Sequence, residues 1–104
     1  MHVAARERDR WLSPAWYGAQ AMQRRVQFAI LLQFAEHRTA DLATTAAIVP
    51  GTSGRDMKVA LENLLEEGAL DGPSGRVESL LELAGGGWLR LTDRGRQRLD
   101  EDDL

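Results

Sequence analysis

The sequence predicts an α+β fold that is mostly helical, with a three-helix core, a two-stranded β-hairpin and a short C-terminal helix. Apolar residues recur at helical spacing in three stretches up to residue 67, and after "DGPSG" at 71–75 the pattern changes to alternation. Turns containing glycine or proline separate these stretches. A length of 104 residues predicts one domain, with residues 1–12 as an N-terminal extension and 100–104 as a disordered acidic tail.

The first helix is predicted to begin at Pro14, because Ser13 is a good N-cap and proline is tolerated in a first turn. Its pattern ends at 36–38, where Glu, His and Arg follow one another. Apolar residues cover more than one stripe of this helix: Met22, Val26, Phe28, Ala29, Ile30, Leu31, Leu32 and Ala35. Such a helix is either wrapped by its own domain or paired with another molecule.

A short second helix is expected to end at Ile48, capped by either Thr39 or Asp41. Pro50 and Gly51 then form a turn, since the residue before a proline is biased away from helix.

The third helix, 54–67, has the clearest boundaries in the sequence. Ser53 and Asp56 have the spacing of a capping box, and Gly68 lies where a glycine commonly ends a helix. Its apolar residues recur at helical spacing: Met57, Leu61, Leu64 and Leu65.

Two strands are predicted after the third helix. Residues 77–83 alternate, "AGGG" at 84–87 is read as the hairpin tip, and 88–92 alternate again. Trp88 is expected to pack under this ribbon rather than to contact a ligand at its tip. Thr92 and Asp93 then open the last helix, "TDRGRQRL".

Charge and composition exclude several classes of function. Residues 1–38 carry six arginines against three acids, whereas residues 39–104 carry seven bases against thirteen acids. Without cysteine there is no disulfide framework or cysteine-rich zinc site, and we find no catalytic constellation, so no enzyme activity, cofactor or metal is predicted. No apolar run is long enough to cross a membrane, and we expect a cytoplasmic protein.

This order of elements resembles the winged helix-turn-helix family of bacterial transcriptional regulators. "LENLLEEGAL" at 61–70 is similar to a recognition helix running into a wing, and "WLRLTDRGRQRL" at 88–99 is similar to the second wing strand and the helix after it. "DLA" at 41–43 is similar to the start of the helix that precedes the recognition helix. The resemblance implies that the third helix enters the major groove of double-stranded DNA while the wing lies on the backbone or in the minor groove. Two departures are the longer connection containing Pro50 and Gly51, and the acidic balance of this half.

The candidate DNA-binding residues are Thr52, Ser53, Arg55, Lys58, Asn63, Arg76 and Arg90. Arg55 is suited to guanine and Asn63 to adenine, while Thr52 and Ser53 could hold a phosphate at the helix N-terminus. Arg94 and Arg96 are further candidates for phosphate contacts. The alternative interpretation is a solvated helix face on which Lys58 pairs with Glu62.

Aromatic residues near the N-terminus are typical of docking surfaces. Trp11, Trp16, Tyr17 and Phe28 are the candidate homodimer or partner interface, and the alternative is that they fold back on this domain's own core. The leading hypothesis is therefore a dimeric winged-helix regulator that reads DNA with residues 54–67. The second is a winged-helix protein-interaction module, an adaptor or inhibitor that does not bind DNA.

Overall fold

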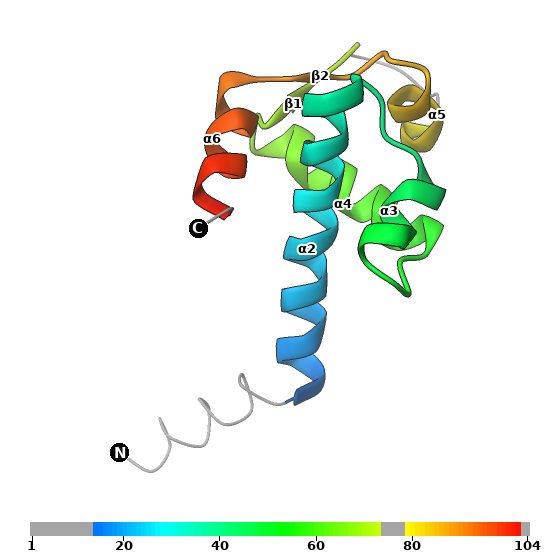
Figure 1. Cartoon of the computed structure of the whole chain (residues 1–104), viewed down its shortest axis with the longest axis vertical. Coiled ribbons are helices and arrows are strands. Elements are labelled where there is room, and N and C mark those ends of the chain that lie inside the picture. The colour runs from blue at the N-terminus through cyan, green and yellow to red at the C-terminus, as the bar shows by residue number, and fades with distance from the viewer. Residues whose placement is uncertain (1–13, 74–78, 103–104) are drawn as a thin grey trace.

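The computed structural model describes residues 14–73 and 79–102, which form helices around one central helix and a small sheet (Figure 1). In chain order the elements are α2 (Pro14–His37), α3 (Leu42–Ile48), α4 (Gly54–Glu66), β1 (Leu70–Asp71), α5 (Leu80–Gly85), β2 (Arg90–Leu91) and α6 (Asp93–Asp102). Helix α2 runs the length of the molecule, with α6 on one side and α3 and α5 on the other. The fold is thus mixed α+β and mostly helical, with a two-stranded antiparallel sheet, as the sequence predicts.

The core lies between α2 and α4. On α4, Met57, Ala60, Leu61 and Leu64 are completely buried, and their spacing places them on one face of the helix. They meet Val26, Ile30 and Leu31 of α2, which are also fully buried. Each large aliphatic side chain buried in this way contributes about 1.5–3 kcal/mol.

Local signals explain where the helices begin and end. Asp41 caps α3 by accepting a hydrogen bond from Thr44 N at 2.7 Å, which decides between Asp41 and Thr39. The capping box of α4 is confirmed, because Ser53 and Asp56 each accept a hydrogen bond from the other's backbone amide. Gly68, with a φ of +83°, ends α4 in the left-handed conformation that glycine favours.

The predicted hairpin is wrong in its first strand. Within the described residues, β2 pairs with β1, so that Leu70 lies opposite Leu91 and Asp71 lies opposite Arg90. Residues 80–85 form helix α5 instead of a strand, and the amide of Ala40 donates to the carbonyl of Ala84 at 3.1 Å. The connection between the two strands therefore carries a helix where the first strand of the hairpin was expected.

The physical reason lies in the composition of "LLELA" at 80–84. A short apolar run fits both periods, and leucine, glutamate and alanine favour helix over strand. In the helix, Leu83 and Ala84 are buried against the core. Trp88 was also predicted wrongly, since its 66% exposure shows that it does not pack under the sheet.

The last helix extends to Asp102, further than the sequence predicts. None of the helices within the two described ranges is long and apolar enough to span a bilayer.

Candidate functional site

The outer face of α4 carries the candidate residues that the sequence places in a DNA groove. Arg55, Lys58, Glu62 and Asn63 are all exposed, on the side of the helix opposite its buried stripe. Val59, 38% exposed, lies among them. The helix is thus held by one face and presents the other to solvent.

The two cations of this face have no acidic partner in the described part of the chain. Lys58 and Glu62 have the spacing of a helical ion pair, yet they form none, and Arg55 forms none either. Both positive charges are available to an external anion.

The start of α4 is less open than the sequence suggests. Thr52 is buried, with 8% exposure, and its hydroxyl donates to the carbonyl of Val49 at 2.6 Å, so the prediction that it faces a phosphate is wrong. Ser53 is exposed, but its hydroxyl oxygen accepts from Asp56 N at 3.1 Å, and the Asp56 carboxylate accepts from Ser53 N at 3.0 Å. The capping box thus already occupies two of the backbone donors that would bind an anion here.

Arg90 lies in a different place from Arg55. It belongs to β2, which pairs with the strand after the C-terminal end of α4, whereas Arg55 is in the first turn of that helix. Arg76 lies outside the described residues, as does Trp11, and for Trp16 and Tyr17 the structure describes only the backbone. The structure therefore does not assemble the predicted residues into one cluster.

Arg90 instead lines a cavity of about 380 Å³ together with two other arginines, Arg38 and Arg96. They come from three elements: Arg38 follows the end of α2, Arg90 is in β2 and Arg96 is on α6. Apolar residues and one glycine complete the described lining, which is Phe34, Arg38, Gly87, Leu89, Arg90, Leu91 and Arg96. We call this the arginine cavity.

The arginine cavity has little signal in the sequence. Arg38 looked like the end of a helix, and Arg90 and Arg96 were expected to contact DNA. The excess of arginine over acid in the first 38 residues indicates a basic region that includes Arg38. Which arginines from later in the chain line the same cavity depends on how β2 and α6 pack against α2.

Two acids on elements next to the arginine cavity, Glu67 and Asp71, have partners outside it. On α6, Arg94 and Arg98 both pair with Glu67, while Arg96, between them in sequence, forms no ion pair with a described residue. Asp71, opposite Arg90 in the sheet, accepts from the amide of Gly72 at 3.0 Å.

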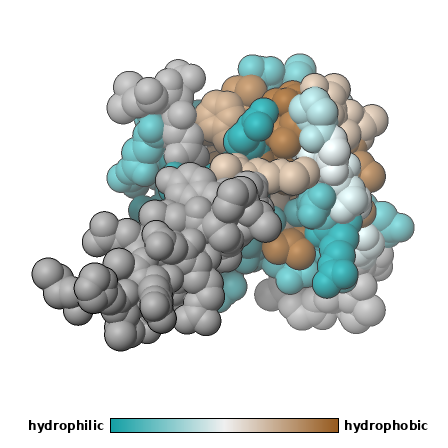
Figure 2. All heavy atoms as spheres, turned by 90° about the horizontal axis from the view of Figure 1, so that it is seen from below, coloured by the Kyte–Doolittle hydropathy of each residue, from teal (hydrophilic) through white to brown (hydrophobic). Residues whose placement is uncertain are grey.

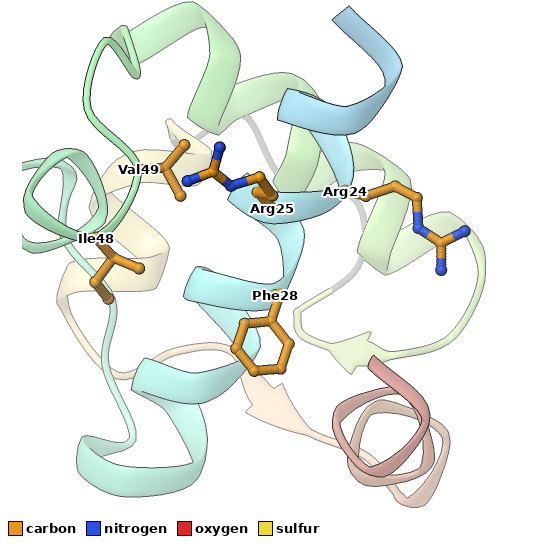
Figure 3. A pocket seen from close by; sticks show the side chains of 5 residues that line it. All are labelled: Arg24, Arg25, Phe28, Ile48 and Val49. Atoms are coloured by element: carbon orange, nitrogen blue, oxygen red, sulfur yellow. The ribbon is translucent and has the colours of Figure 1, made fainter. Parts of the chain in front are cut away.

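A second cavity, of about 320 Å³, lies between α2 and the end of α3 (Figure 3). Among the described side chains, those that line it belong to Arg24, Arg25, Phe28, Ile48 and Val49. Phe28 is half-buried here, so part of this predicted interface residue is accessible. In Figure 3 the Arg25 side chain extends toward Val49, while Arg24 points away from the other four.

Comparison of the chain with known protein families, with curated proteins and with solved structures finds no match.

Proposed function

We propose that this chain is a winged-helix type DNA-binding module that reads duplex DNA with α4 and acts as a transcriptional regulator. The supporting observation is the presentation of α4. One face is buried against α2, and the opposite face offers Arg55, Lys58 and Asn63 to solvent. The order of three helices followed by two antiparallel strands also supports the proposal, although α5 lies between the strands.

The residues on this face of α4 are suited to binding in a groove of duplex DNA with modest affinity. Arginine binds guanine through two hydrogen bonds, asparagine binds adenine in the same way, and lysine neutralises phosphate. Glu62 and Glu66 are exposed on the same helix and oppose the approach of a polyanion. Binding is therefore expected to be strong only at low salt. Each neutralised phosphate contributes about one unit to the slope of log binding constant against log salt concentration.

Fluorescence anisotropy with a labelled random-sequence duplex, measured across a salt series, tests the proposal. Arg55→Gln and Lys58→Gln are each expected to weaken binding. Each should also reduce the steepness of the plot of log binding constant against log salt concentration by about one unit. Arg94→Gln is the matched control: the sequence makes Arg94 a candidate phosphate contact, but in the structure it lies 3.7 Å from Glu67, and this proposal assigns it no contact with the duplex. Absence of binding to any duplex at low salt would overturn the proposal.

We propose in addition that the protein forms a homodimer through the first half of α2. The first turns of α2, which include Trp16 and Tyr17, project beyond the other elements. Sedimentation velocity at micromolar concentration is expected to show a dimer that Trp16→Ala weakens. A monomer at every concentration would remove this part of the proposal.

The second candidate, a protein-interaction module, is favoured by a separate observation. Leu42 and Ile48 of α3 and Val59 of α4 are each 37–40% exposed, although they are large and apolar. Figure 2, which looks at the end of the molecule where α2 begins, shows apolar side chains exposed between hydrophilic ones. If duplex binding is absent, affinity capture on the wild-type protein compared with an Ile48→Ser, Val59→Ser variant tests this candidate. A partner retained equally well by both would contradict it.

A further inference from the structure

We propose that the arginine cavity binds a small organic anion, a carboxylate or phosphate monoester carried on a compact apolar group. Three arginines from separate elements line it together with the apolar residues Phe34, Leu89 and Leu91. This site lies outside the α4 surface, and the inference does not depend on DNA binding.

The charge of the cavity selects for an anion. Arginine stays charged at physiological pH, and its planar fork forms paired hydrogen bonds with carboxylate or phosphate. Arg38, Arg90 and Arg96 form no ion pair with any residue that the structure describes. In a protein of net charge −3, three arginines that have no ion-pair partner among the described residues form a local basic site at one cavity.

The floor of the cavity selects for an apolar body. Phe34 and Leu89 each retain only 3% exposure, whereas Leu91 is half-buried, so the apolar surface that a ligand could cover belongs mainly to Leu91. A volume of about 380 Å³ falls within the range of small-molecule sites. Inorganic phosphate alone would leave this apolar surface uncovered, whereas a compact aromatic acid would cover it.

The backbone at Arg38 gives an independent argument. With a φ of +64°, Arg38 is the one residue other than glycine with a positive φ among those described. Glycine is the usual residue there, and a side chain costs roughly 1 kcal/mol. A cation near a helix end is favourable in itself. However, that interaction does not require this strained position. We therefore explain the presence of arginine rather than glycine at position 38 by its place in the cavity lining.

The test uses the full chain labelled with ¹⁵N and four probes: benzoate, phenyl phosphate, benzyl alcohol and inorganic phosphate. Amide signals of Gly87, Leu89 and Leu91 are the reporters, since these residues line the cavity. Saturable shifts are expected with benzoate or phenyl phosphate, and the stronger of the two identifies the acidic group. Benzyl alcohol lacks the charge and inorganic phosphate lacks the apolar body, so both are expected to bind at least about tenfold more weakly, a difference of about 1.4 kcal/mol.

Variants then show which arginines hold the probe. Arg38→Gln, Arg90→Gln and Arg96→Gln are each expected to raise the Kd of the better probe about tenfold, because each removes a charge-assisted hydrogen bond. Arg94→Gln is the control on the same helix as Arg96, and its Kd should stay at the wild-type value. The dispersion of the amide spectrum shows directly whether each variant is folded.

Three outcomes would overturn the inference. The first is the absence of saturable shifts at millimolar concentrations of both organic anions. The second is an equal response to benzyl alcohol, which would mean that charge plays no part. The third is a loss of duplex binding in the three cavity variants as large as that caused by Arg55→Gln, which would assign the arginines to a nucleic-acid surface. Failure of duplex binding alone would leave the probe titrations interpretable, since they contain no DNA.

Discussion

The side chain of Gln33 on α2 donates a hydrogen bond to the hydroxyl of Thr45 on α3 at 2.7 Å, and both residues are buried. The same Gln33 nitrogen donates to the carbonyl of Ala29 at 3.2 Å, and its oxygen accepts from the amide of Asp41 at 3.1 Å. The hydroxyl of Thr45 in turn donates to the carbonyl of Asp41 at 2.8 Å. This network fixes the start of α3 on α2 and therefore helps to set the position of α4 behind it.

Replacing Thr45 with valine keeps the shape of the side chain and removes the hydroxyl. We expect a loss of about 1–2 kcal/mol in the free energy of unfolding, because one N–H of Gln33 is then buried without an acceptor. Thr44→Val is the matched control: Thr44 is exposed, and among the described residues its hydroxyl bonds only to Asp41, so its cost should stay below about 0.5 kcal/mol. Urea unfolding measures both, and equal costs would show that the buried network adds no stability.

Gly95 lets α6 approach the sheet closely. A Cβ at this position would collide with the carbonyl oxygen of Ala69 and with the side chain of Leu91. Gly95→Ala is therefore expected to cost about 2–3 kcal/mol, despite the higher helix propensity of alanine. Gly85→Ala is the control, because its Cβ would meet nothing closer than 3.9 Å. A Gly95→Ala protein as stable as wild type would mean that α6 does not dock as closely as the structure shows.

The sequence predicted the elements that depend on local signals and missed those that depend on tertiary packing. The capping residue Ser53 and the terminating glycine Gly68 mark α4 within the chain itself, so both of its ends were predictable. Residues 80–85 have no comparable cap bond, since Ser79 makes no side-chain hydrogen bond to the helix. Their helical conformation depends on burial of Leu83 and Ala84 against the core, which a periodic pattern of six residues does not reveal.

The candidate site residues also divide into those whose position follows from local sequence and those whose position depends on tertiary packing. The exposure of Arg55 and Lys58 follows from helical periodicity, because both lie opposite the apolar stripe. The burial of Thr52 depends on a hydrogen bond within the turn, and the presence of Arg38 and Arg96 at one cavity depends on how α6 packs against α2. Neither relationship has a signature in the spacing of residues.

Two substitutions of Arg38 separate backbone strain from charge. Arg38→Gly relieves the positive φ, whereas Arg38→Gln keeps the strain, and both remove the cation. The glycine variant is expected to be more stable than the glutamine variant by about 1 kcal/mol in thermal or urea unfolding. Both should lose affinity for the organic anion. Equal stabilities of the two variants would show that Arg38 is not strained, and the argument from its backbone would be withdrawn.

Glu67, which follows α4, pairs with two arginines of α6 in different environments. The Arg98 side chain is 12% exposed, and it also donates to Gln27 of α2 at 3.0 Å, whereas the Arg94 side chain is 53% exposed and lies 3.7 Å from Glu67. Glu67→Gln retains an acceptor but removes the charge opposite the mostly buried Arg98, so we expect a loss of about 1–2 kcal/mol. Arg94→Gln breaks only the exposed pair, and its cost should stay below about 0.5 kcal/mol. The ratio of the two losses, measured by urea unfolding, reports which arginine Glu67 stabilises. A cost for Arg94→Gln as large as that for Glu67→Gln would place the stabilising pair at the surface and leave Arg98 held by Gln27.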